Sequence, residues 1–160
     1  MIRLGFHKAV ATVLGLGYAP FGPGTFGTLG AVLSCYAYQA FFEDFPSVVV
    51  LVSGSIIFGV VGIWSTEVVS REWGDDPSRV VMDEYVGYLI SLLFIPLNHV
   101  TLISAFILFR FFDILKPLGI GYIDKNVKGS LGVMLDDVLA GVYSCITLHL
   151  LVLIFPQFFV

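Results

Sequence analysis

Five long apolar segments dominate this 160-residue chain and restrict what it can fold into. They cover residues 26–42, 47–64, 85–95, 99–112 and 138–159, with short polar stretches between them. Strands exposed on one face alternate polar and apolar residues, and these segments do not, so we predict helices. Only 12% of the residues are charged, about half the share of a soluble domain. We therefore predict an all-α, polytopic membrane helix bundle of about five transmembrane helices, forming a single domain over residues 1–160.

The third and fourth segments are short for this architecture. A membrane-spanning helix needs about 20 residues, and these segments run from Tyr85 to Ile95 and from His99 to Phe112. They could extend at their polar ends, toward Pro77 and Lys116. The alternative is a re-entrant hairpin that enters and leaves on one side. The sequence leaves both possibilities open.

The charges are distributed unevenly along the chain. With five spans, all eight Lys and Arg residues fall on the side that holds the amino terminus and the polar stretches 66–83 and 113–128. The positive-inside rule makes this side cytoplasmic. Ten of the twelve acidic residues lie on the same side, which predicts a cytoplasmic-face active site. The net charge of −4 argues against nucleic acid as a partner, because phosphate backbones attract clustered positive charge.

The cysteines and histidines give no sign of a catalytic or metal centre. Cys35 and Cys145 lie inside apolar runs, so we expect free buried thiols. The three histidines, His7, His99 and His149, lack metal-ligand spacing and are expected to be structural.

The first candidate motif is Y-A-P-F-G-P-G-T-F-G-T, residues 18–28. Its prolines and glycines predict a tight loop with exposed backbone N–H groups before the first span, where an oxyanion or phosphate could bind. It lacks the G-K-[ST] of a P-loop. The alternative is a helix-entry turn capped by Thr28. Thr25 of this loop is a candidate phosphate-binding residue.

The second motif is D-D-P-S-R-V-V-M-D-E-Y-V-G, residues 75–87. If Pro77 opens a helix, Asp76 is its cap and Asp83 lies nearly two turns inside. Gly87 then follows Asp83 by one turn on the same face, which leaves room for a ligand or another backbone. Asp83 and Glu84 at the entry of a membrane span are costly unless they are neutralised.

Two further motifs add basic and acidic groups. In F-R-F-F-D-I-L-K-P, residues 109–117, Arg110, Asp113 and Lys116 fall along one helical face that Pro117 ends. In K-G-S-L-G-V-M-L-D-D-V-L-A-G, residues 128–141, Asp136 and Asp137 precede the last span, each followed four residues later by a small residue. Two cations around one acid suit a phosphate beside a metal.

Together these motifs predict a site for Mg²⁺ and a phosphorylated lipid at one membrane face, since hard carboxylate oxygens suit Mg²⁺. The candidate metal ligands are Asp76, Asp83, Glu84, Asp136 and Asp137. The candidate phosphate-binding residues are Thr25, Arg110, Lys116 and Lys128. The candidate catalytic residues are Asp83, Glu84, Asp113, Lys116, Asp136 and Asp137.

These four motifs, in this order, resemble those of the phosphatidylglycerophosphatase A family, over nearly the whole chain. The resemblance implies Mg²⁺-dependent hydrolysis of phosphatidylglycerophosphate to phosphatidylglycerol and inorganic phosphate, in phospholipid biosynthesis at the bacterial inner membrane. It implies a phospholipid substrate among membrane lipids, and no protein partner is evident. Two departures affect loop shape: Gly119 stands where the family often has a second proline, and Gly129-Ser130 where it often has two glycines.

Two other functions remain open from the residues alone. A non-catalytic metal or ion transport component would also contain intramembrane acids, but its polar groups should lie near mid-membrane. Another phospholipid phosphotransferase would need a longer run of spaced aspartates on one segment.

For a phosphatase we expect water to attack phosphorus in line, without a covalent enzyme intermediate. The rival mechanism is an aspartyl-phosphate with Asp113 as the nucleophile.

Overall fold

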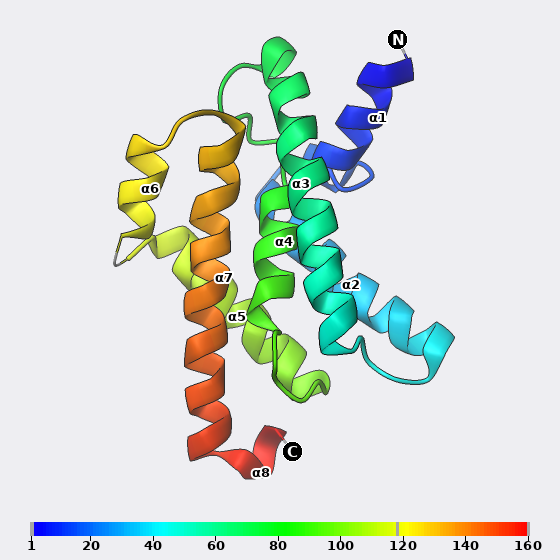
Figure 1. The fold of residues 1–160 in the computed structure, drawn as a ribbon, viewed down its shortest axis with the longest axis vertical. Helices are drawn as coiled ribbons and strands as arrows, with labels where there is room; N and C mark the ends of the chain where they lie inside the picture. The colour runs from blue at the N-terminus through cyan, green and yellow to red at the C-terminus, as the bar shows by residue number, and fades with distance from the viewer. Residues whose placement is uncertain (1, 118, 160) are drawn as a thin grey trace.

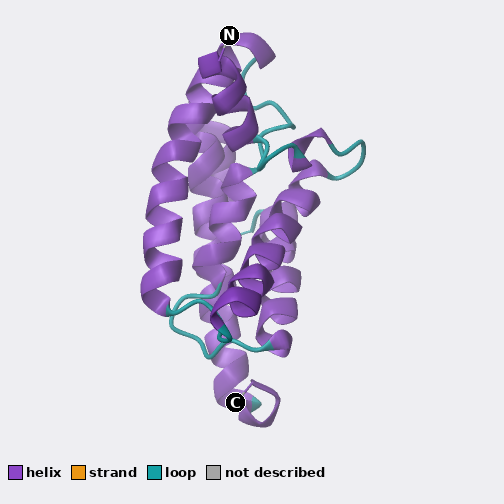
Figure 2. Cartoon of the chain, turned by 90° about the vertical axis from the view of Figure 1, so that its right-hand side faces the viewer, coloured by secondary structure: helices purple, strands orange, loops and turns teal. Residues whose placement is uncertain are grey.

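The computed structural model describes residues 2–117 and 119–159, and this part consists of helices joined by short loops (Figures 1 and 2). The α-helices are α1 (Ile2–Ala11), α2 (Pro23–Phe42), α3 (Val48–Trp73), α4 (Met82–Ser91), α5 (His99–Leu115), α6 (Ile120–Asn126), α7 (Gly129–Ile154) and α8 (Pro156–Phe159). A short 3₁₀ helix, η1, covers Leu16–Tyr18. The described residues include no strand, so the all-α prediction is confirmed.

The long helices extend further than the apolar segments that predicted them. α3 continues beyond Trp64 to Trp73, and α7 begins at Gly129 instead of Val138. The added part of α3 keeps a buried face, with Thr66 and Val69 inside, because it packs against α1. Packing of one apolar face is enough to continue a helix through a stretch that is polar on its other face.

Two of the described helices, α3 and α7, are long and apolar enough to cross a membrane by length and composition. α4 has 10 residues, a length of about 15 Å, which is about half the hydrocarbon core of a bilayer. The possible extension of this segment toward Pro77 reaches only Met82, three residues before Tyr85, with Val81 as the N-cap residue. The fourth segment does extend, to Leu115.

α4 is the central helix of the bundle and contacts α2, α3, α5 and α7. Its buried residues point in all directions, among them Tyr85, Val86, Tyr88 and Leu89. A helix that is apolar all round is stable only when protein surrounds it. This enclosure explains how so short a segment can be helical within the bundle.

α4 packs most closely on α7, which runs in the same direction (Figure 1). A Cβ atom added to Gly141 would lie 3.2 Å from the Cα of Gly87 and nearer still to its carbonyl oxygen. A Cβ atom added to Gly87 would lie 2.6 Å from the carbonyl oxygen of Asp137. Small residues at such a crossing let two helix backbones approach each other.

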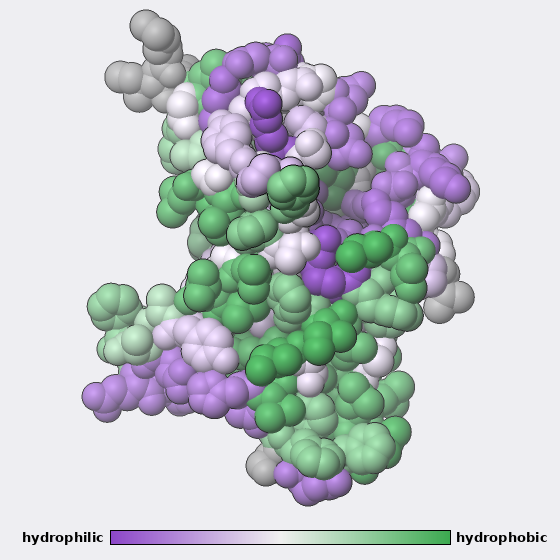
Figure 3. Space-filling model, turned by 180° about the vertical axis from the view of Figure 1, so that it is seen from behind, coloured by the Kyte–Doolittle hydropathy of each residue, from purple (hydrophilic) through white to green (hydrophobic). Residues whose placement is uncertain are grey.

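The bundle has two distinct ends. The amino terminus, the loop 74–81 and α6 lie toward one end, and the α2–α3 loop, residues 92–98 and the carboxyl terminus lie toward the other (Figure 1). This grouping agrees with the predicted arrangement of the polar stretches. In the space-filling view the first end is largely hydrophilic, and an apolar belt lies below it (Figure 3).

Candidate active site

A cavity of about 520 Å³ lies where α2 and α4 begin, α5 ends and α7 begins. The loop 74–81 and the segment 124–129 complete its wall. The predicted site residues that line it are Asp76, Asp83, Glu84, Arg110, Asp113, Lys116, Lys128, Asp136 and Asp137. Thr25 is the one predicted residue outside this lining set; its N–H donates to the carbonyl oxygen of Gly22 (2.9 Å) in the first turn of α2.

Three carboxylates form a compact cluster inside the cavity. Asp83, Glu84 and Asp137 each offer one oxygen, and these oxygens lie within 4.8 Å of one another. Asp83 is 7% exposed and Asp137 is 4% exposed. The cluster follows from the glycine crossing, because each aspartate lies one turn before its glycine on two helices that run in parallel.

The start of α4 differs from the prediction made from Pro77. Residues 77–80 form a turn, in which the N–H of Val80 donates to the carbonyl oxygen of Pro77 (2.8 Å). Asp76 has a φ of 50° and lies in the loop, so it is not a helix cap. Asp83 and Glu84 are therefore in the first turn of α4, not two turns inside. This position is electrostatically better for carboxylates, because a helix N-terminus carries partial positive charge.

Several buried polar atoms in the cavity have no hydrogen-bond partner among the described residues. They include Oδ1 of Asp83, Oε2 of Glu84 and Oδ1 of Asp136. Leaving such an atom buried and unpaired costs about 1–3 kcal/mol, and more for a charged group. A divalent cation held by the cluster would satisfy oxygens of Asp83 and Glu84, and clustered carboxylates are the ligands that Mg²⁺ prefers. The residues present therefore fit the predicted metal.

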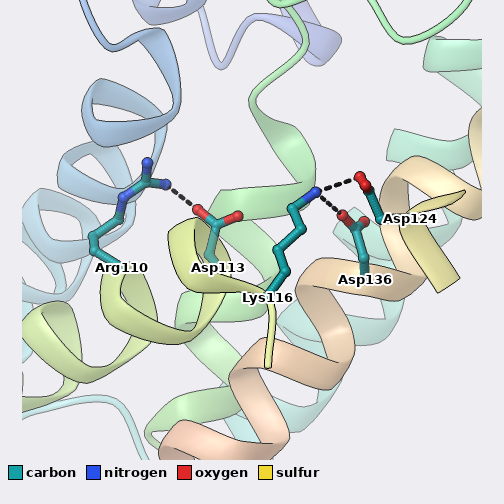
Figure 4. Close-up of polar contacts among 5 residues, drawn as sticks. All are labelled: Arg110, Asp113, Lys116, Asp124 and Asp136. Carbon is teal, nitrogen blue, oxygen red and sulfur yellow. Dashed lines mark hydrogen bonds and ion pairs between the residues drawn. The ribbon is translucent and has the colours of Figure 1, made fainter. Parts of the chain in front are cut away.

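Arg110 and Asp113 form an ion pair on α5, with Nη1 and Oδ2 2.5 Å apart (Figure 4). The Nε of Arg110 is also buried and has no hydrogen-bond partner in the described part of the chain. A Cβ atom on Gly24 would collide with Oε1 of Glu84 and lie 3.2 Å from Nη1 of Arg110. The start of α2 therefore lies directly against these two side chains, and a larger residue at position 24 would displace one of them.

Lys116 lies at the C-cap of α5 and forms ion pairs with Asp124 and Asp136, the latter at 2.7 Å (Figure 4). Burial lowers the pKa of Lys116, but the hydrogen bonds and charges of the two carboxylates outweigh this and raise the pKa above its usual range. Lys116 is therefore a permanent cation beside the acid cluster. The predicted end of the helix before Pro117 is confirmed.

Asp124 is a cavity residue that the sequence did not identify. It lies on α6 and reaches Lys116 across the turn that follows α5. The helical periodicity of the sequence relates residues within one helix. It does not relate Lys116 at the end of α5 to Asp124 on α6. The only available signal was one acid within the polar stretch 113–128.

The histidines and cysteines lie outside the cavity lining. His7 hydrogen-bonds Ser65 (3.1 Å) and His99 hydrogen-bonds Tyr36 (3.1 Å). Both cysteines are free; Cys35 is buried, as expected, while Cys145 is only partly buried. These observations agree with the structural roles predicted for them.

Comparison with known proteins gives one consistent family. The family model of phosphatidylglycerophosphatase A matches residues 9–152. A protein of Bacteroides thetaiotaomicron named "Putative phosphatidylinositol-3-phosphatase" is 45% identical over 143 residues, which cover 86% of this chain and 87% of that protein. The phosphatidylglycerophosphatase A of Escherichia coli is 34% identical over 84% of this chain and 77% of its own length. That of Haemophilus influenzae is 35% identical over 86% and 83%. No solved structure matches the chain.

Proposed function

This chain belongs to the phosphatidylglycerophosphatase A family, and from that premise we propose that it is a Mg²⁺-dependent lipid phosphatase. Its proposed reaction is hydrolysis of phosphatidylglycerophosphate to phosphatidylglycerol and inorganic phosphate, a step of phospholipid biosynthesis. The observation that carries the proposal is the cavity itself, where a buried three-carboxylate cluster lies beside Arg110 and Lys116. Metal-assisted phosphoryl transfer uses this combination of metal ligands and cations.

Asp83, Glu84 and Asp137 would hold the metal ion. When bound, Mg²⁺ shields the negative charge of the phosphate and lowers the pKa of water. Asp136 and Asp76 are weaker candidates as ligands, since Asp136 is paired with Lys116 and Asp76 lies on the exposed loop. An ion-transport component, the alternative left open by the residues, has no support from this family.

Two basic side chains would orient the phosphate. Arg110 is held by Asp113, and its buried Nε has no partner among residues 2–117 and 119–159, so that this N–H can donate to a phosphate oxygen. Lys116 adds a fixed positive charge from the opposite side of Asp113 along α5 (Figure 4). Lys128 lies at the exposed rim, where it can attract an anionic head group. Positioning and charge stabilisation supply most of the catalysis in such reactions.

We propose that water attacks phosphorus directly and that the bond from phosphorus to the glycerol oxygen breaks. One of the clustered carboxylates accepts the proton of the water and returns it to the departing glycerol oxygen. Asp113, the candidate nucleophile of the rival mechanism, is paired with Arg110 rather than with Lys116. This pairing favours an orienting role for Asp113. Direct attack inverts configuration at phosphorus, so retention with a chirally labelled substrate would contradict it.

A second candidate substrate is phosphatidylinositol 3-phosphate. The Bacteroides thetaiotaomicron relative, which is 45% identical, is named as a phosphatidylinositol-3-phosphatase. Both lipids present a phosphate monoester on a glycerophospholipid. Purified protein in mixed micelles should be tested on each lipid at several mole fractions. We expect kcat/KM for phosphatidylglycerophosphate to be the higher by at least about tenfold, or about 1.4 kcal/mol. The reverse order would transfer the assignment to the inositol lipid, and no phosphate release from either would overturn the proposed function.

We also propose a multi-pass location in the bacterial cytoplasmic membrane, with the cavity on the cytoplasmic face. Successive helices α2, α3, α4, α5 and α7 alternate in direction along the bundle (Figure 1), which supports this proposal. The exposed residues Ser78 and Asn126 lie at the cavity end. Cysteines introduced at these positions should resist membrane-impermeant labelling of intact cells. Labelling from outside would overturn this orientation.

A further inference from the structure

The rim of the cavity combines polar and apolar residues. Asp75, Ser78 and Lys128 are exposed polar residues of its lining. On α5 the lining residues are Arg110, Asp113 and the apolar Ile114, which is 65% exposed. In the space-filling view strongly hydrophilic atoms lie where the hydrophilic upper part of the molecule meets the apolar belt (Figure 3). The cavity therefore borders both a polar and an apolar surface.

An apolar stripe continues from this rim along α5. It consists of Ile103, Ile107, Phe111 and Ile114, which are 58%, 61%, 52% and 65% exposed. Their spacing of four, four and three residues places them on one helix face. Arg110 borders this face, because it lies three residues after Ile107 and four before Ile114. The stripe thus leads directly away from the proposed phosphate-binding group.

The length of the stripe matches a lipid in one leaflet. From Ile103 to Ile114 the helix rises by about 16 Å, and one leaflet takes up half of a hydrocarbon core of about 30 Å. We propose that this stripe binds an acyl chain of the substrate, a glycerophospholipid whose terminal phosphate lies in the cavity. The inference rests on the proposed lipid phosphatase function. It adds the surface along which the acyl chain of the substrate would lie.

The polar rim gives the products separate exits. Inorganic phosphate leaves past Asp75, Ser78 and Lys128 into water, while the dephosphorylated lipid stays on the apolar side of the mouth. Neither product has to cross a surface of the opposite polarity. A substrate in the same leaflet can therefore enter from the side without leaving the membrane.

A second apolar surface provides a matched control. A groove of about 460 Å³ between α3, α4 and α7 is lined by Ile56, Met134 and Val138, among other residues. Val138 is rotated by about 200° from Asp136 around α7, and the groove shares no lining residue with the cavity. Ile56 and Ile107 are both 61% exposed. Substituting them tests two equally exposed isoleucines, of which only one lies on the stripe.

The experiment compares Ile107→Ser and Ile56→Ser in mixed micelles, with phosphatidylglycerophosphate and phosphatidylinositol 3-phosphate as alternative substrates. Ile107→Ser should raise KM for the lipid that the wild type hydrolyses by about five- to tenfold, with kcat within about twofold. Inhibition by glycerol phosphate, which has no acyl chain, should be unchanged. Ile56→Ser should match the wild type, and both variants should keep its melting temperature to within a few degrees.

Two outcomes would overturn the inference while leaving the phosphatase function intact. One is a wild-type KM in Ile107→Ser, confirmed in the double variant Ile107→Ser, Ile103→Ser. The other is a raised KM in Ile56→Ser alone, which would place the chain in the groove between α3 and α7. Absence of phosphate release by the wild type from both lipids is a different result. It would remove the proposed function and, with it, the acyl-chain surface.

Discussion

The two ends of the bundle differ in whether their polar side chains have hydrogen-bond partners. At the end with residues 92–98, Asn98 accepts a hydrogen bond from the N–H of Thr101 (2.9 Å) and donates one to the carbonyl oxygen of Phe159 (2.8 Å). The hydroxyl of Thr101 donates to the carbonyl oxygen of Pro96 (2.9 Å). At the cavity end, oxygens of Asp83, Glu84 and Asp136 are buried without partners in the described structure.

This difference separates stability from function. Buried polar groups in proteins are nearly always hydrogen-bonded, so several unpaired oxygens in one place need an explanation. At the end of the bundle that contains residues 92–98, polar side chains cap α5 and stabilise the turn before it. The cavity end concentrates like charges that repel one another, which stabilises the fold only when a cation is present. Substitutions at the two ends should therefore have opposite effects on activity and stability.

The largest effect is expected from Asp83→Asn, which removes one charge from the acid cluster. Activity should fall at least about a thousandfold, because the cluster loses a metal ligand. The melting temperature should stay the same or rise, since the change reduces repulsion between buried charges. Phosphate release and thermal unfolding measure the two quantities. A variant with activity within tenfold of the wild type would exclude Asp83 from the site.

Lys116→Ala should have the next largest effect. Loss of a charge-assisted contact to phosphate costs about 1.5–3 kcal/mol, which corresponds to a fall in kcat/KM of about 10- to 100-fold, mainly through KM. The informative comparison is Asp124→Asn, which removes one partner of Lys116 and leaves Asp136 in place. It should change kcat/KM much less. Wild-type kinetics in Lys116→Ala would remove this residue from the site.

Gly141→Ala should damage stability and activity together. The added Cβ would lie 3.2 Å from the Cα of Gly87 and closer to its carbonyl oxygen, so that α4 and α7 must move apart. Overpacking of this kind costs about 1–3 kcal/mol and separates Asp83 from Asp137. Gly59→Ala is the control, since its new Cβ would meet only Val86, at 3.9 Å. Equal melting temperatures for the two variants would argue against the glycine crossing.

The smallest effect on activity is expected at the opposite end. Asn98→Ala removes the cap of α5 and the contact with Phe159. It should lower the free energy of unfolding by about 1–2 kcal/mol and leave kcat and KM unchanged. Unfolding in detergent and phosphate release are the two measurements. A loss of activity without a loss of stability would contradict the separation of the two ends.

Most of the residues that line the cavity could be predicted because they lie in short motifs. The spacing of Arg110, Asp113 and Lys116 predicted one helical face, and all three residues line the cavity. The glycine one turn after Asp83 predicted room for a ligand or another backbone, and the same acid-then-small pattern recurs at Asp137. That the two small residues meet each other, Gly87 against Gly141, could not be predicted, because it depends on which helices become neighbours.

The errors have local physical causes. Pro77 is a favourable first residue of a helix, but Asp76 has a left-handed backbone conformation and the chain turns before α4 begins. The pairing of Lys116 with Asp124 depends on the path of the chain between α5 and α6. The polar parts of α3 and α7 are helical because they pack on neighbours, and composition alone does not reveal this.

The most direct test of the account is the dependence of phosphate release on Mg²⁺. Purified wild-type protein should be assayed with phosphatidylglycerophosphate in excess EDTA and again after Mg²⁺ is restored, with Asp83→Asn in parallel. We predict that EDTA abolishes turnover by the wild type, that Mg²⁺ restores it, and that Mg²⁺ does not restore it in Asp83→Asn. Undiminished turnover by the wild type in excess EDTA would contradict a metal-binding role for the buried carboxylates.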